Sequence, residues 1–156
     1  MSVLDRAVVA TDSEEVAEIC RVLGAPVEMT SSDHLSGTDR VAEVADRNEY
    51  RDFDFIVNVQ GDEPLLKEEH VRATIDLVRD GRWDVGTCAT PLNTDVARTD
   101  ASVVKVVRAA SGRALYFSRA PIPYKRDEKP VGEELEQEPF LRHIGIYAYT
   151  RAALHD

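Results

Sequence analysis

The segment from Phe55 to Pro64, with the sequence FIVNVQGDEP, constrains the fold of this chain more than any other. Its first half is a run of β-forming residues, and its second half stops at a glycine, two carboxylates and a proline before a helical pattern begins. Such a run is typical of a buried strand in a parallel sheet. Ligands bind at the carboxyl ends of strands in open α/β sheets. The segment therefore predicts that Asp62 and Glu63 lie in a ligand-binding crevice.

Two interpretations of Asp62 follow from this position. A Mg2+ ion commonly takes one or two carboxylates and leaves its remaining positions to water and substrate phosphates. Asp is also a common cap of a following helix, here one that begins after Pro64. The strand–turn–helix pattern taken alone favours the cap.

Composition narrows the function classes. The chain has 156 residues, which suits one domain with a sizeable core. Its net charge of −10 argues against general binding to nucleic acid, whose phosphates it would repel. The two isolated cysteines show neither a disulfide framework nor zinc-site spacing, so we expect a reducing compartment. With no leader pattern and no apolar run of membrane-spanning length, we expect a cytoplasmic protein without a membrane partner.

Strands and helices alternate over the first 90 residues. Short apolar runs predict the strands, and apolar residues at helical spacing predict the helices. The alternation predicts a three-layer α/β/α fold with a mainly parallel sheet. Strands are predicted at 7–11, 26–30, 55–60 and 85–90, and helices from a cap at Asp12 to a stop at Gly24, at 39–48 and at 67–80.

The pattern changes after Pro91. Residues 103–108 and 113–117 read as two strands joined by Ala-Ala-Ser-Gly, which predicts a hairpin. Residues 118–139 are irregular and proline-rich, with an acidic run that is typical of a solvated loop. A last strand is predicted at 140–149. We therefore expect a hairpin and mixed-sheet extension within the same single domain.

The loop after the first strand is unusual for a nucleotide-binding α/β fold. Such folds usually carry a glycine-rich or basic phosphate loop there. Here the loop is Asp12-Ser-Glu-Glu15, which would repel a triphosphate, and no Walker or Rossmann glycine pattern occurs in the sequence. Either the fold binds no phosphate, or its phosphate loop lies upstream of Met1.

Seven motifs, in order and spacing, closely resemble the 3-deoxy-manno-octulosonate (Kdo) cytidylyltransferases, or CMP-Kdo synthetases. The resemblance spans nearly the whole chain and implies a nucleotidyltransferase-like (Rossmann-like) fold. It also implies that residues 1–156 are the central portion of the enzyme, without its basic N-terminal phosphate loop and its C-terminal acidic metal ligand. The motifs are VATD (9–12), MTSSDH (29–34), SGTDR (36–40), NVQGDEP (58–64), VVKVV (103–107), ALYFSRAPIP (114–123) and LRHIGIY (141–147).

The resemblance implies a reaction in which CTP and Kdo give CMP-Kdo and pyrophosphate, for lipopolysaccharide biosynthesis. It implies Mg2+ as the cofactor and Asp62 as its ligand and as the catalytic residue, so metal binding now outweighs capping. Family members are typically homodimers, and we expect the interface in 118–140. Nucleotide binding is implied for Ser36, Gly37, Thr38, Arg40, Gln60 and Gly61, and sugar-acid binding for Arg119, His143 and Tyr147.

Alternatives remain open for several of these residues. Arg40 can be an ordinary surface Arg at a helix end, and His143 and Tyr147 can be hydrogen-bonded core residues. Strand alternation puts His143 and Tyr147 on one face, which permits a shared pocket. Lys105 is predicted to point outward, either as a ligand contact or as an exposed strand Lys. The competing functions are a truncated remnant that dimerises or binds a ligand, and a nucleotidyltransferase for another acidic sugar.

Overall fold

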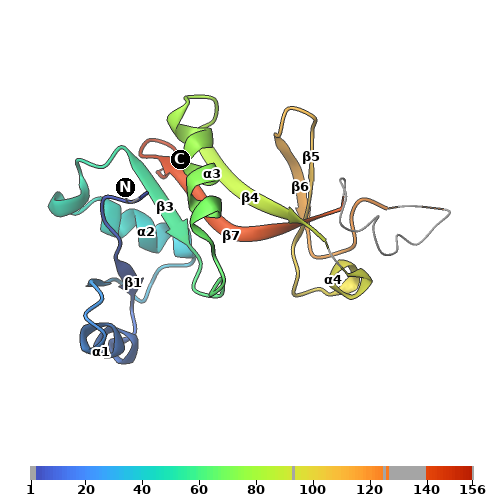
Figure 1. Ribbon diagram of the computed structural model, residues 1–156. Helices are drawn as coiled ribbons and strands as arrows, with labels where there is room; N and C mark the ends of the chain where they lie inside the picture. The colour runs from blue at the N-terminus through green and yellow to red at the C-terminus, as the bar shows by residue number, and fades with distance from the viewer. Residues whose placement is uncertain (1–2, 93, 125, 127–139, 156) are drawn as a thin grey trace. The chain divides into compact units, whose positions relative to one another are not determined.

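A computed structural model describes residues 3–92, 94–124, 126 and 140–155. The chain forms two compact units, one of residues 1–86 and 146–156 and one of residues 87–145. The single domain expected from the sequence stays a prediction. In chain order the elements are β1 (Val9–Thr11), α1 (Glu14–Val22), β2 (Val27–Met29), α2 (Gly37–Ala45), η1 (Asn48–Tyr50), β3 (Phe55–Val59), α3 (Glu68–Arg79), β4 (Val85–Pro91), α4 (Asp95–Thr99), β5 (Lys105–Arg108), β6 (Ala114–Ser118) and β7 (Leu141–Thr150) (Figure 1).

In the first unit, β1 and β2 form a two-stranded parallel sheet, as the alternation of strands and helices predicts. The helix that joins them, α1, packs against both strands. Its N-cap is Ser13, whose Oγ accepts a hydrogen bond from the Val16 amide at 3.4 Å. The predicted cap at Asp12 is therefore wrong by one residue, and the Asp12 carboxylate has a different partner, described below.

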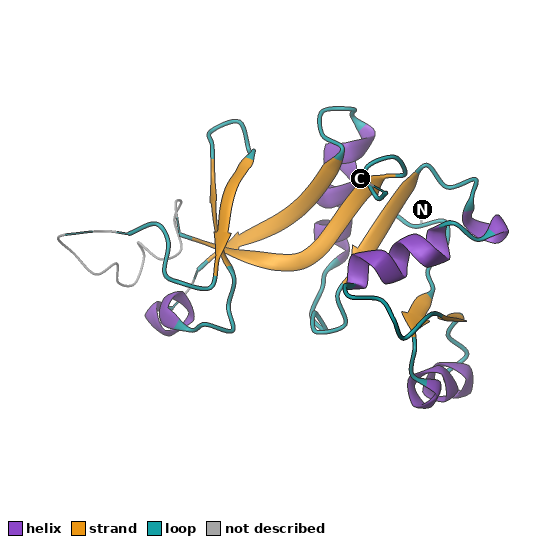
Figure 2. Ribbon diagram, turned by 180° about the vertical axis from the view of Figure 1, so that it is seen from behind, coloured by secondary structure: helices purple, strands orange, loops and turns teal. Residues whose placement is uncertain are grey.

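Helix α2 begins two residues earlier than predicted because a capping box sets its start. The Asp39 amide donates to Ser36 Oγ at 3.1 Å, and the Ser36 amide donates back to Asp39 Oδ2 at 3.1 Å. The helix packs against both β1 and β3 (Figure 2). Its last residue, Ala45, joins Tyr149 and Leu154 in a buried hydrophobic cluster. The segment 36–40 is consequently the first turn of a helix.

A five-stranded sheet has the order β3-β7-β5-β6, and β4 also pairs with β7. Strand β3 runs antiparallel to β7, with Phe55 opposite Thr150 and Val59 opposite Ile146. The alternation predicts a mainly parallel sheet, but only β1 and β2 are parallel among the pairs described here. The pairs β3–β7, β5–β6 and β5–β7 are antiparallel. The reason is the insertion of β7 beside β3, a pairing across about 90 residues that local periodicity does not reveal. The α/β class with a hairpin extension is confirmed.

Strand β3 stands at the end of the sheet order, and β7 is its one neighbour within the described part of the chain. Its terminal residues Phe55 and Val59 are 37% and 44% exposed. The continuous apolar run predicted a strand buried on both faces. Within the described part of the chain, no strand pairs with the second edge of β3.

The second unit contains the predicted hairpin of β5 and β6, drawn in orange in Figure 1. The two strands are antiparallel, with Lys105 opposite Ser118, and Gly112 takes φ +90° in the turn. Strand β5 also pairs with β7, where Lys105 lies opposite Arg142. A short helix that the sequence did not predict, α4, begins at Thr94, whose hydroxyl accepts from the Ala97 amide at 3.1 Å.

Two further expectations concern the dimer interface and membrane-spanning segments. The interface predicted in 118–140 falls largely on residues 125 and 127–139, which lie outside the described residues, so it stays a prediction. Within the described ranges, no helix is both long enough and apolar enough to cross a lipid bilayer.

Gly86 provides a test of how β4 packs on α3. A Cβ added there would lie 2.7 Å from the Thr74 carbonyl oxygen and 3.1 Å from Leu77 Cβ. We expect Gly86→Ala to lower the free energy of unfolding by about 1–3 kcal/mol, because a backbone atom must move. Urea denaturation measures the change. Gly37→Ala is the control, because nothing lies within 4 Å of its added Cβ, and an equal loss in both variants would contradict this packing.

Candidate active site

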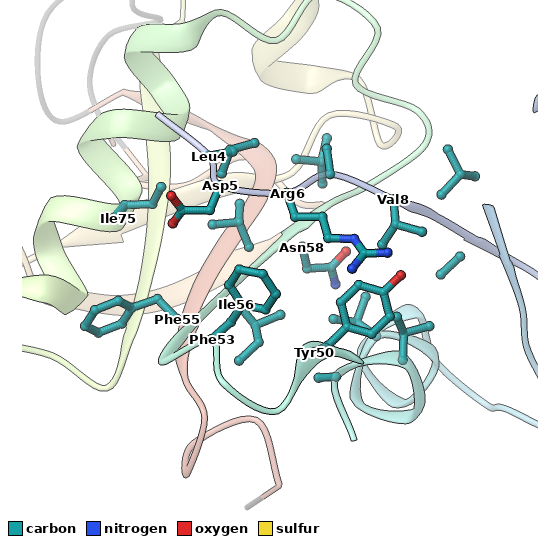
Figure 3. A pocket seen from close by; sticks show the side chains of 18 of the residues that line it. Leu4, Asp5, Arg6, Val8, Tyr50, Phe53, Phe55, Ile56, Asn58 and Ile75 are labelled. Carbon is teal, nitrogen blue, oxygen red and sulfur yellow. The ribbon is translucent and has the colours of Figure 1, made fainter. Parts of the chain in front are cut away.

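A cavity of 930 Å³ in the first unit brings together four of the residues predicted to bind nucleotide. It lies among β1, α2, β3 and the turn after β3 (Figure 3). Gly37 and Arg40 line it from α2, and Gln60 and Gly61 line it from the turn. Ser36 and Thr38 flank Gly37 on the first turn of α2 without lining the cavity.

Arg40 is held inside this unit rather than lying loose on its surface. Its Nη2 donates to Asp12 Oδ2 at 2.9 Å, and its Nη1 donates to the Thr30 hydroxyl and, at 3.2 Å, to the Ser31 carbonyl. Only 19% of its side chain is exposed. Arg40 is thus a half-buried, ion-paired residue near the start of α2, and its contact with nucleotide stays a prediction. The guanidinium joins the loops after β1 and β2 and keeps one positive group at the cavity.

The loop before α2 is fastened by a second charged group, Glu43. Its Oε2 accepts from the Ser31 amide at 2.9 Å and lies 2.6 Å from His34 Nε2, and its Oε1 accepts from Arg47 Nη2 at 2.7 Å. These contacts, with the Ser31 amide first, then His34 and Arg47, lower the pKa of Glu43 to about 2. The carboxylate thus ties residues 31–34 to the same helix that carries Arg40.

Among the cavity side chains that were not predicted from the sequence are Arg6, Tyr50 and Asn58. Figure 3 shows the Arg6 guanidinium beside the Tyr50 ring and the Asn58 amide, and its carbon lies 4.6 Å from the ring centroid. Tyr50 is buried and donates to Glu28 Oε1 at 2.6 Å. Burial, and then this carboxylate, raise the pKa of Tyr50. The one available signal was Asn58, a polar residue inside the apolar run of β3.

Asp62 lies in the turn after β3 and is exposed, and, unlike Gly61 and Glu63 on either side of it, it is not among the residues that line the cavity. It does not cap the next helix, because α3 begins after Lys67, whose amide donates to His70 Nδ1 at 3.3 Å. The capping interpretation is therefore wrong. Among the described residues no group of three or more His, Cys, Asp or Glu side chains could hold a metal. An exposed carboxylate at the end of a strand fits Mg2+, which needs one or two carboxylates and takes its other ligands from water and phosphate.

Arg119 is an exposed residue of the second unit, directly after β6. Its Nη1 donates to the carbonyls of Ala101 and Ser102 at 2.9 and 3.1 Å. One edge of the guanidinium is thereby fixed to the loop before β5. The planar fork of Arg suits a carboxylate, which it can bind through two parallel hydrogen bonds.

Lys105 is buried. It is therefore neither an exposed strand Lys nor a residue that a ligand can reach. Its side chain has 0% exposure, and its Nζ donates to three carbonyls, those of Asp100, Val103 and Arg119, at 2.8, 2.6 and 2.6 Å. Burial lowers the pKa of Lys105, while Asp100 opposes that change. The predicted outward direction is wrong because β5 lies between β6 and β7 and the loop before it closes over the ammonium.

His143 and Tyr147 are both half-buried. His143 belongs to the second compact unit and Tyr147 to the first. In the second unit, His143 Nε2 lies 2.8 Å from the Thr87 hydroxyl, and the ring meets Phe117 edge-on at 5.1 Å. In the first unit, the Tyr147 ring stacks on Tyr149 at 6.0 Å, and burial raises its pKa. Each residue thus has core packing, and their shared pocket stays a prediction.

Two known proteins resemble this chain over nearly its whole length. Over 155 residues the chain is 48% identical to a protein of Gemmatimonas aurantiaca (strain DSM 14586 / JCM 11422 / NBRC 100505 / T-27) named 3-deoxy-manno-octulosonate cytidylyltransferase, covering 99% of this chain and 58% of the relative. A solved structure of CMP:2-keto-3-deoxy-manno-octonic acid synthetase complexed with CTP superposes with a TM-score of 0.78 at 36% identity. That match covers 97% of this chain and 59% of the other, so the chain spans less than two thirds of either relative.

The structural match shows that the chain has the α/β fold of a nucleotidyltransferase-like protein. The sequence pattern of the cytidylyltransferase family matches residues 1–155. The chain belongs to the cytidylyltransferase family. The resemblance found from its seven motifs is confirmed.

Glu43 gives the site a testable dependence on pH. Its pKa is about 2 in the folded protein, below the ordinary value of 4.5, so its carboxylate stabilises the fold above about pH 4.5 and loses that effect as the pH falls through about 2. We expect Glu43→Gln to lower the thermal unfolding midpoint at pH 7 and to approach the wild-type midpoint near pH 2. Differential scanning fluorimetry across this range measures the change.

The control is Glu15→Gln, an exposed carboxylate on α1, which should leave the midpoint unchanged throughout. A Glu43→Gln difference that stays constant from pH 7 to pH 2 would show that the carboxylate charge is not what fastens the loop.

Proposed function

We propose that the chain forms the nucleotide- and sugar-binding part of an enzyme that transfers the cytidylyl group of CTP to Kdo. The anomeric hydroxyl oxygen of Kdo bonds to the α-phosphorus, the bond from this phosphorus to the β-phosphate oxygen breaks, and pyrophosphate and the hydroxyl proton leave. The observation that carries the proposal is the gathering of Gly37, Arg40, Gln60 and Gly61 at one cavity in a chain of the cytidylyltransferase family.

The nucleotide side of the reaction is assigned to this cavity. The N-terminus of α2 carries a partial positive charge that favours an anion, and Gly37 leaves its backbone open to close approach. Arg40 supplies a guanidinium that Asp12 and Thr30 already hold in place. A preorganised donor stabilises developing phosphate charge without having to reorganise. Binding of CTP by the solved relative supports this assignment.

Mg2+ is the proposed cofactor, and Asp62 is the residue of this chain that would hold it. When bound, the ion neutralises phosphate oxygens and lowers the pKa of a coordinated hydroxyl. Asp62 stands at the carboxyl end of β3, directly after Gln60 and Gly61 of the cavity. Its exposure leaves the carboxylate accessible to an ion.

The sugar acid is assigned to the second unit, through Arg119 and His143. Arg119 is exposed and anchored through Nη1, which leaves the other side of its fork available for a carboxylate. His143 is the second residue assigned to the sugar acid, and its ring orientation is fixed because Thr87 and Phe117 contact it. These roles match the name of the Gemmatimonas relative, which acts on 3-deoxy-manno-octulosonate.

The proposal also covers the compartment, the oligomeric state and the biosynthetic role of the protein. We place the protein in the cytoplasm, as a homodimer, in lipopolysaccharide biosynthesis. Free thiols at Cys20 and Cys88 support the compartment, and the relative's name, which gives 3-deoxy-manno-octulosonate, supports the role that the family resemblance implies. The homodimer rests on the family resemblance alone. Size-exclusion chromatography with light scattering measures the oligomeric state.

The decisive experiment is pyrophosphate release with CTP, Mg2+ and Kdo. It compares this chain with an extended enzyme, in which the segments of the Gemmatimonas relative that flank the matched region are fused to both ends. We expect Kdo-dependent release from the extended enzyme. Release that is absent from a folded extended enzyme, or that does not depend on Kdo, would contradict the proposal.

Asp62→Asn in the extended enzyme tests the metal assignment. We expect turnover to fall by roughly 100-fold or more, because the charge that holds the ion is lost while the turn keeps its shape. The unfolding midpoint should not change, because Asp62 is exposed. Asp80→Asn, at the exposed end of α3, is the matched control and should keep full turnover. Unchanged turnover in Asp62→Asn would remove this residue from the site.

A further inference from the structure

Lys105 is a fully buried cation to which the proposed reaction assigns no role. Its Nζ donates three hydrogen bonds of 2.6–2.8 Å, all to main-chain carbonyls. An ammonium group has three N–H donors, whereas a neutral amine has two and would turn a lone pair toward one of these oxygens. The geometry therefore requires the charged form, although burial alone disfavours it.

Two of the three carbonyls belong to a loop that also binds the Arg119 side chain, and the third belongs to Arg119 itself. Within the loop 100–103, Lys105 takes the carbonyls of Asp100 and Val103, and Arg119 takes those of Ala101 and Ser102. All four successive carbonyls of this loop thus accept from one of two cations. The third bond of Lys105 goes to the carbonyl of Arg119 itself.

This arrangement fixes Arg119 at two points. Lys105 holds the main chain from which the Arg119 side chain extends, and it also holds the loop to which Nη1 is bonded. The loop is stiffened further by Asp100, whose Oδ1 accepts from both the amide and the hydroxyl of Ser102 at 2.7 Å. Among the described residues, the side-chain hydrogen bonds of Arg119 all use Nη1, so Nε and Nη2 remain as donors for a ligand.

We propose that Lys105 is a positioning residue that holds the Arg119 guanidinium in the orientation needed to bind the carboxylate of the sugar acid. This inference rests on the proposed function, which gives Arg119 that ligand. Lys105 itself touches no substrate, because its side chain is fully enclosed. Without it, the loop 100–103 and the main chain at 119 lose their common anchor. Errors of about 1 Å in such an anchor can cost roughly 100-fold in rate or affinity.

The test is steady-state kinetics of the extended enzyme with Lys105→Met, which keeps an unbranched side chain one atom shorter and removes the donors. We expect KM for Kdo to rise by roughly 10- to 100-fold while KM for CTP stays the same. Lys105→Gln keeps two N–H donors, so it tests the proposal if the Met variant does not fold, and it should give a smaller rise. Arg113→Met, an exposed cation in the turn of the same hairpin, is the control and should change neither KM.

Arg119→Met distinguishes an error in the sugar-acid role of Arg119 from an error in the positioning role of Lys105. If KM for Kdo is unchanged in Arg119→Met, the sugar-acid role in the proposed function is wrong. If Arg119→Met raises it and a folded Lys105→Met does not, only the positioning role of Lys105 is overturned. Failure of both Lys105 variants to fold, or an equal rise in both KM values, would also overturn it, because Lys105 would then serve the stability of the unit as a whole.

Discussion

The pairing of β3 with the last strand, β7, is the interaction on which the candidate site depends. It holds β3 along one edge, from Phe55 opposite Thr150 to Val59 opposite Ile146, and so fixes where the strand ends and where Gln60, Gly61 and Asp62 begin. All of β3, Phe55–Val59, lines the cavity. A strand that pairs along one edge and packs against α2 and α3 can carry a ligand site beside it.

The candidate site carries positively charged side chains, although the chain as a whole is negatively charged. The protein carries a net charge of −10, yet Arg6 and Arg40 stand at the cavity and Arg119 is exposed in the second unit. Each of these cations has a fixed neighbour: the Tyr50 ring for Arg6, Asp12 for Arg40, and two carbonyls for Arg119. An oriented cation binds a specific anion without attracting polyanions in general, which suits a protein whose proposed ligands are a nucleotide and a sugar acid.

The sequence predicted most elements of this fold and several residues of the site, and its failures have physical causes. Apolar periodicity located α1, α3 and the β5–β6 hairpin to within a few residues, because it depends on local burial. It could not predict that β7 inserts beside β3, since pairing between distant segments leaves no local pattern. Lys105 was misassigned for a related reason: three carbonyls satisfy its ammonium, and the loop that supplies two of them closes only in the folded chain.

A titration of the isotope-labelled chain with CTP, followed by amide NMR, shows whether the β3–α2 cavity binds the nucleotide. We expect the amide signals of Gly37, Arg40, Gln60 and Gly61 to shift together and saturate, while that of Gly112 in the hairpin turn stays fixed. Saturable shifts confined to other residues, or no shift of these four at millimolar CTP, would contradict it.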